Sequence, residues 1–113
     1  MWLVTTRGFY SVVEDTTDPE QHDRLLIRAR VRADLEALRD LLPGLDILET
    51  PDSDYHFRIS VTKPVFAGIA FHLVTEIDYP NFKNTIAERA GYERAHVYGS
   101  VWQDLLELRS PAG

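Results

Sequence analysis

Residues 55–62 read YHFRISVT, and this stretch decides the fold that we predict. Apolar and polar side chains alternate along it without a break, which is the pattern of a β-strand with one face in the core. The apolar set is Tyr55, Phe57, Ile59 and Val61. The opposite face of this strand is then expected to meet solvent.

A second alternating stretch at 24–31 predicts a neighbouring strand, with Leu25, Ile27, Ala29 and Val31 on its apolar side. Two more strands are expected at 2–6 and 9–14, which are rich in β-branched and aromatic residues. Gly8 marks a bend between them. Residues 46–50 predict a short strand before the turn that leads into residue 55.

Between these strands the apolar period lengthens to that of a helix. The first helix carries Leu35, Leu38 and Leu42 after Val31 and ends at Pro43-Gly44. A second helix is expected over 64–76. Its predicted core stripe is Val65, Ile69, Leu73 and Ile77. Two further helices come after it, one capped by Asn81 and running to Ala90, the other ending near Leu108.

The expected order is therefore ββαββα with extra helical material at its end, which is an α+β fold. A split βαβ unit with one added strand would be a circularly permuted ferredoxin-like plait with extra C-terminal helices. Right-handed crossovers then place the first two helices on one sheet face. An antiparallel α+β sandwich with another strand order is the alternative. We expect a single α+β domain over 1–109 and a frayed tail over 110–113.

The amino-acid composition excludes several classes of protein and of functional site. The 113 residues include no cysteine, which excludes a disulfide scaffold, a cysteine zinc site and a cysteine nucleophile. The net charge of −6 disfavours non-specific binding to nucleic acid or to an anionic membrane. No signal-peptide pattern opens the chain, and the apolar stretch at 65–74 is too short to span a membrane. We expect a cytoplasmic protein with no membrane partner.

The first candidate site is the solvent face of the expected sheet, where the two central strands carry an excess of arginine. The candidates for binding are Arg28, Arg30, His56 and Arg58. Guanidinium groups in such a cluster bind an anion, a phosphodiester or an acidic protein surface. RNA-recognition domains of this architecture stack bases on outward aromatics, and the outward positions of these two strands carry none. The alternative is a solvated face whose charges pair with nearby Asp and Glu, or a face that the C-terminal helix covers.

The second candidate is the segment IDYPNFKN at 77–84, together with the helices expected after it. Its contact candidates are Tyr79, Asn81, Lys83 and Asn84. Asn81 and Glu88 share a helix face, and with His96 they supply the polar groups of a small enzyme site. In the plainer interpretation Asn81 caps a helix and Glu88 is solvated.

Motifs that would name a cofactor do not occur. The four histidines lie in separate segments without metal-binding spacing. The chain has no nucleophile elbow, no P-loop and no dinucleotide-binding motif. We therefore expect no metal and no cofactor.

Several segments carry a resemblance. They are WLV at 2–4, RGFYSVV at 7–13, LIRAR at 26–30, DY at 54–55 before Arg58 and Val61, IDYPNFKN at 77–84, and His96 with Val101-Trp102. Together they resemble a family of short, uncharacterised bacterial proteins of about this length. That family has no established activity, so the resemblance implies a bacterial or phage single-domain protein and transfers no site residue.

The resulting expectation is a small, non-enzymatic binding or regulatory module that acts through protein–protein contacts. Its partner would be another protein or a second copy in a homodimer. Two alternatives stay open. One is an anion or nucleic-acid binder that uses the arginine-rich sheet face, although the net charge disfavours nucleic acid. The other is a small enzyme built on Asn81, Glu88 and His96.

Overall fold

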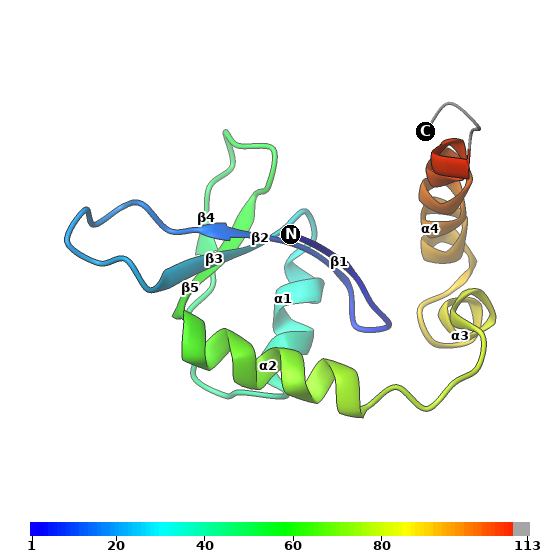
Figure 1. The fold of residues 1–113 in the computed structure, drawn as a ribbon, viewed down its shortest axis with the longest axis horizontal. Coiled ribbons are helices and arrows are strands. Elements are labelled where there is room, and N and C mark those ends of the chain that lie inside the picture. The colour runs from blue at the N-terminus through cyan, green and yellow to red at the C-terminus, as the bar shows by residue number, and fades with distance from the viewer. Residues whose placement is uncertain (110–113) are drawn as a thin grey trace. The chain divides into compact units, whose positions relative to one another are not determined.

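An antiparallel sheet organises the first part of the chain (Figure 1). The computed structural model describes residues 1–109, so the tail expected at 110–113 lies outside the described residues. The strand order is β1-β2-β3-β5-β4, and every neighbouring pair is antiparallel. The strands are β1 (Trp2–Val4), β2 (Phe9–Glu14), β3 (Arg24–Ala29), β4 (Leu48–Glu49) and β5 (Phe57–Thr62).

The chain divides into two compact units, of which the first is Met1–Asp78 and the second starts at Tyr79. The first unit holds the sheet with helices α1 (Arg32–Arg39) and α2 (Lys63–Thr75). The described part of the second unit consists of α3 (Phe82–Arg89), α4 (Tyr92–Leu105) and the 3₁₀ turn η1 (Leu106–Arg109). That both units form one domain over 1–109 stays a prediction.

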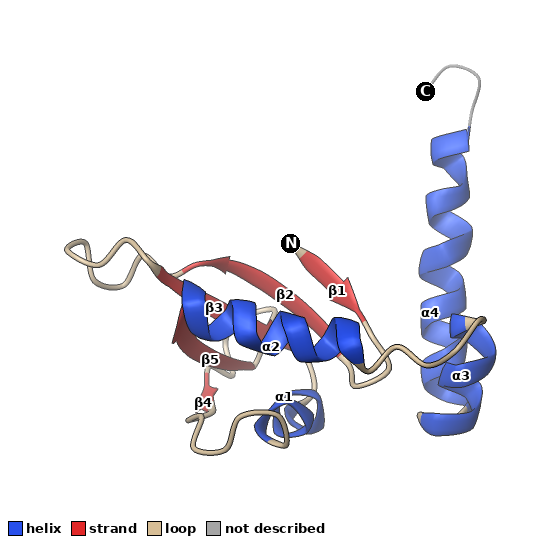
Figure 2. Ribbon diagram, turned by 60° about the horizontal axis from the view of Figure 1, so that its bottom comes forward, coloured by secondary structure: helices blue, strands red, loops and turns tan. Residues whose placement is uncertain are grey.

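The α+β class and the overall ββαββα order are confirmed. Within the sheet, the order β2-β3-β5-β4 agrees with the order that a circularly permuted plait requires. The ferredoxin-like assignment itself stays a prediction. Helix α2 runs along one face of the sheet (Figure 2). Side chains of both α1 and α2 pack with the apolar residues of the strands in one core.

The core of the first unit lies between that sheet face and the two helices. Alternate residues of β3 and β5 supply its floor, as the period-two pattern predicts. The buried cluster comprises Tyr10, Val12, Ile27, Ala29, Leu35, Leu38, Ile59, Val61, Phe66 and Ile69. The central strands therefore present their apolar side to the helices and their arginine side elsewhere.

The predicted core stripe of α2 is wrong at both ends. The buried residues are Phe66 and Ile69, whereas Val65 and Ile77 are 36% and 55% exposed. Helix α2 is apolar on nearly every side, so periodicity alone does not select the face that packs. The helix begins directly after β5, where the Thr62 hydroxyl caps it by accepting the Val65 N–H at 3.3 Å.

A close approach between Gly8 and Asp34 ties α1 to the first hairpin. The buried Asp34 carboxylate accepts the Phe9 N–H at 3.0 Å. The Tyr10 hydroxyl donates to the Asp34 carbonyl at 2.6 Å. A Cβ at position 8 would lie only 2.4 Å from Asp34 Cγ, so this position requires glycine.

Arg7 joins three segments of the same unit. Its Nε and Nη2 donate to the two carboxylate oxygens of Glu76 at 2.8 and 2.9 Å, just after α2. Its Nη1 donates to the Ala37 carbonyl of α1 at 2.8 Å. The hydrogen bonds to Glu76 raise the pKa of Arg7, as expected for a paired guanidinium.

Asp15 fixes the end of β2 to β5. Its carboxylate accepts the Ser60 hydroxyl at 2.7 Å and the Thr17 N–H at 3.0 Å. These hydrogen bonds, the one from Ser60 first, lower the pKa of Asp15 to about 2. The ionised carboxylate is thereby favoured in the folded chain.

The second unit is a helical hairpin. Asn81 caps α3, because its side-chain oxygen accepts the Asn84 N–H at 3.0 Å, as the sequence predicts. Gly91, with φ at +92°, makes the turn between the helices. Ile86 and Tyr98 are buried, and the Tyr98 ring of α4 stacks on the Phe82 ring of α3 with centroids 5.9 Å apart. Within residues 1–109, no helix has both the length and the apolar character needed to cross a membrane.

We expect Gly8→Ala to destabilise the protein by about 1–3 kcal/mol, because the new Cβ displaces Asp34 from the Phe9 N–H. Urea unfolding measures this loss. Gly68→Ala is the matched control, since a Cβ there meets no atom within 4 Å. That helical substitution is expected to stabilise by up to about 1 kcal/mol. A G8A variant as stable as wild type would contradict the role of the close approach.

Stability is expected to fall between about pH 5 and pH 2 as Asp15 takes up a proton. Its folded pKa of about 2 lies below the unfolded value of about 3.9, so its contribution is full above that range and lost below it. Asp15→Asn should cost on the order of 1–2 kcal/mol at pH 7 and flatten the acid limb of the curve. Urea unfolding at several pH values tests this, with Asp52→Asn as the control. An unchanged acid limb in D15N would refute it.

Candidate functional site

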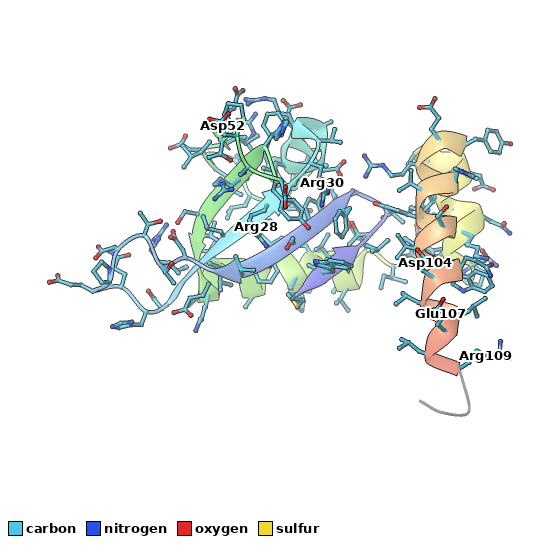
Figure 3. The ribbon with its side chains drawn as sticks, turned by 90° about the horizontal axis from the view of Figure 1, so that it is seen from above. Arg28, Arg30, Asp52, Asp104, Glu107 and Arg109 are labelled. Carbon is cyan, nitrogen blue, oxygen red and sulfur yellow. The ribbon has the colours of Figure 1, made fainter. Side chains whose placement is uncertain are left out.

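Alternation along the central strands places arginines on the sheet face opposite the core. Ile27 and Ala29 are buried beneath the helices, so Arg28 between them points to the other side. Arg58 of β5 lies directly across the ladder from Arg28. Arg30 comes just after the end of β3, and Figure 3 shows Arg28 and Arg30 over this strand, with Asp52 in the loop before β5. We call Arg28, Arg30, Arg58 and the adjoining Tyr55 the arginine face.

Tyr55 is the main correction to the predicted strand. It was expected on the core side with Phe57, but β5 begins only at Phe57, and Tyr55 belongs to the preceding loop. Its buried ring lies on the arginine side, where the guanidinium carbons of Arg28 and Arg30 are each 4.6 Å from the ring centroid. Alternation ends where the strand ends, so the pattern does not determine the position of this residue.

Two guanidinium groups on the arginine face have incomplete hydrogen bonding. Arg28 Nη2 donates to the Ser11 hydroxyl at 2.8 Å, and Arg58 Nη2 donates to the Ser53 hydroxyl at 3.0 Å. In the described chain, the Nε–H groups of both arginines are buried and have no partner. A buried donor left unpaired costs about 1–3 kcal/mol.

Neither arginine forms an ion pair with a carboxylate in the described residues, although the Arg28 guanidinium lies against the Tyr55 ring. Among residues 1–109, the ion pairs of the first unit involve Arg7 and Arg32, and none reaches the arginine face. Arg24 differs, because its Nε donates at 3.1 Å to the Ser60 hydroxyl, which is bonded to Asp15. Like charges directly opposite each other on neighbouring strands are destabilising. Within residues 1–109, Arg28, Arg30 and Arg58 therefore have no carboxylate partner in an ion pair.

A row of aromatic rings borders the arginines. The Trp2 and Phe9 centroids are 5.8 Å apart in an edge-to-face contact, and the Phe9 and Tyr55 centroids are 6.5 Å apart. The registers Trp2↔Ser11 and Ser11↔Arg28 place this row on the same face. The two central strands do lack outward aromatics, but aromatics reach this face from β1, β2 and the loop. Alternation along the first hairpin was the signal that could have indicated them.

His56, the fourth candidate of this face, is exposed. Its ring lies 6.2 Å from the Phe57 ring. It precedes β5, as Tyr55 does, so the predicted alternation does not extend to it. Its assignment to the binding site stays a prediction.

The segment at 79–84 makes contacts within its own unit. The Tyr79 ring lies 6.0 Å from Phe82, and Lys83 Nζ lies 3.5 Å from the centroid of Trp102. Asn81 caps α3 through the Asn84 N–H. These roles position α3 and α4, and the proposed contact with a partner protein at Tyr79, Asn81, Lys83 and Asn84 stays a prediction.

The candidate enzyme residues are distributed over the helical hairpin. Asn81 is engaged in its cap, and Glu88 and His96 are exposed on α3 and α4. A shallow depression adjoins His96, and its lining includes neither Asn81 nor Glu88. It is formed by His96, Gly99, Ser100, Gln103 and Asp104. Within residues 1–109, no three histidine or carboxylate side chains gather as a metal site requires.

The outer side of α2 is a surface that periodicity did not indicate. Phe71 and Val74 are each 65% exposed. Nearby, α2 and the end of the α1 region form a groove of about 220 Å³. The groove is lined by Leu41, Leu42, Pro64, Val65, Gly68, Ile69 and His72. The all-round apolar composition of α2 was the available signal for a face that remains uncovered.

Comparison with known proteins adds no relative. No family model, no curated protein and no solved structure matches the chain. The resemblance to short bacterial proteins therefore stays a prediction.

Proposed function

We propose that this chain is a non-enzymatic binding module that holds an oxyanion of the phosphate type on its arginine face. One observation carries the proposal. Arg28 and Arg58 stand opposite each other on the two central strands, each with a buried Nε–H that has no partner in the described chain. The buried Nε–H groups are closed off from solvent, but both side chains are only partly buried, so an oxyanion can bind at the outer guanidinium nitrogens and supply the negative charge that this pair lacks.

The arrangement favours a ligand over a purely structural role. As a structural feature, the pair combines like-charge repulsion with unpaired donors, and both reduce stability. Sites at which local rules are broken without internal compensation are typical of functional surfaces. The net charge of −6 does not oppose this function, because Arg28, Arg30 and Arg58 lie together on one face.

Inorganic phosphate is the probe that tests this proposal. At about ten times its Kd, phosphate should raise the Tm by about 5 °C relative to chloride at equal ionic strength. Arg58→Met should abolish that rise. Without phosphate, R58M should unfold at the same temperature as wild type or a higher one, since it removes the charge repulsion and the orphaned donor. Calorimetric thermal unfolding measures both effects.

Arg109→Met is the matched control, since it removes one exposed arginine from η1. It should keep the full response to phosphate. Equal Tm values of wild type in phosphate and in chloride, or an R58M response equal to that of R109M, would disprove the proposal.

The outer side of α2 supports a second candidate function, a protein–protein contact with a second copy of the chain. Ala67 and Gly68 lie on this exposed side, and small residues allow two helices to approach closely. The exposed Phe71 would supply the central apolar contact.

We expect Phe71→Glu to weaken this dimer by about tenfold or more, because it places a charge at the centre of an apolar contact. Sedimentation equilibrium over a concentration series measures the effect. Val97→Glu on α4 is the control, since this valine is exposed but lies on the other unit. A wild-type chain that stays monomeric at millimolar concentration would exclude the self-association.

A further inference from the structure

We infer that the ligand of the arginine face is single-stranded nucleic acid, whose phosphates contact the arginines while a base stacks on Trp2. This inference rests on the proposed oxyanion site and names its ligand. The observation behind it is the continuity of two surfaces. The aromatic row Trp2, Phe9 and Tyr55 ends where the Arg28 and Arg30 guanidinium groups contact the Tyr55 ring.

The two ends of this row offer different chemistry. Trp2 is 69% exposed at the edge strand of the sheet, so part of its ring surface is available to a ligand. Tyr55 is buried, with both arginines against its ring, and therefore organises the cationic end. A stacking platform beside a cationic groove is the arrangement by which proteins hold single strands without reading their sequence.

The extent of the surface favours a strand over a single nucleotide. Ser11 lies opposite Trp2 and accepts a hydrogen bond from Arg28 Nη2 at 2.8 Å, so the first cation is one strand away from the exposed ring. Arg58 lies across the ladder from Arg28, and Arg30 contacts the far end of the row at the Tyr55 ring. A chain of several nucleotides can place a base on Trp2 and a phosphate at each of these arginines, whereas a mononucleotide has a single phosphate to share among them.

Charge and base accessibility exclude a duplex as the preferred ligand. The bases of a duplex are stacked within it and cannot lie on Trp2. The chain also carries a net charge of −6, so its surface away from the arginine face does not attract a long polyanion. The contact is therefore confined to one face and a few phosphates. Three arginines predict a plot of log K against log salt with a slope of about −2 for a single strand.

The test uses the full chain with a ten-nucleotide uridine RNA, its hybrid with a complementary strand, and uridine monophosphate. The RNA should bind about tenfold or more tightly than the monophosphate, and the hybrid should bind more weakly than the RNA. Trp2→Ala should reduce the affinity for the RNA about tenfold through the loss of stacking. Arg58→Met should reduce the affinity and make the salt slope shallower by about 0.7, whereas R109M should change neither.

Intrinsic fluorescence locates the base, because Trp2 and Trp102 are the two tryptophans of the chain. In Trp102→Phe, where only Trp2 emits, the RNA should quench the emission. In the matched variant Trp2→Phe, where only Trp102 emits, the RNA should leave the emission unchanged, although the phenyl ring still permits binding.

The outcomes separate this inference from the proposed function. If phosphate raises the Tm through Arg58 but the RNA binds no better than the monophosphate, the oxyanion site stands and the single-strand inference fails. Equal quenching of Trp2 and Trp102, or unchanged RNA binding in W2A, also overturns it. If phosphate and RNA both leave R58M and wild type indistinguishable, the two proposals fail together.

Discussion

Gly8 allows the buried carboxylate of Asp34 to reach the main chain of β2, and the first unit depends on this contact. It fixes the start of α1 over the first hairpin through the Phe9 N–H, while Tyr10 bonds the adjacent carbonyl. With α1 held there, Leu35 and Leu38 lie over the central strands and close one side of the core. Ile27 and Ala29 of β3 are buried in this core. Because successive side chains of a strand point to opposite faces, Arg28 between them lies on the other face of the sheet.

That geometric consequence explains how an acidic chain comes to place three arginines side by side on one face of its sheet. The position of Arg28 is a result of the burial of its two neighbours, and the antiparallel register then places Arg58 opposite it. The core stabilises the sheet enough for the mutually repelling pair to be retained. Unlike Arg24, which is bonded to Ser60 near Asp15, these two side chains are not neutralised within the described residues.

Much of the fold could be predicted from sequence, because the apolar residues of the central strands repeat with the period of a strand that has one buried face. The strands at 24–29 and 57–62, the cap at Asn81 and the α+β class result from alternation, capping chemistry and element order. The packed face of α2 could not be predicted, because an all-round apolar helix contains no directional signal. Tyr55 was misplaced because alternation does not extend beyond the strand. The arginines of the candidate site could be identified from the alternation of the central strands. The aromatic rings beside them, Trp2, Phe9 and Tyr55, come from segments far apart in the sequence, and the pairing register that brings them together could not be predicted.

The bond between Arg7 and Glu76 has a consequence for how the chain acquires its structure. Its partners are 69 positions apart, so the two-oxygen bond between the guanidinium near the start of the chain and Glu76 can form only after α2 has been synthesised. During vectorial synthesis the first hairpin therefore emerges before its ionic partner, and its attachment to the rest of the unit is a late event. Contacts of such large sequence separation slow folding, since loop-closure entropy must be overcome before they form. A nascent chain stalled before β5 would expose the unpaired edge of β3 and its apolar side to other chains.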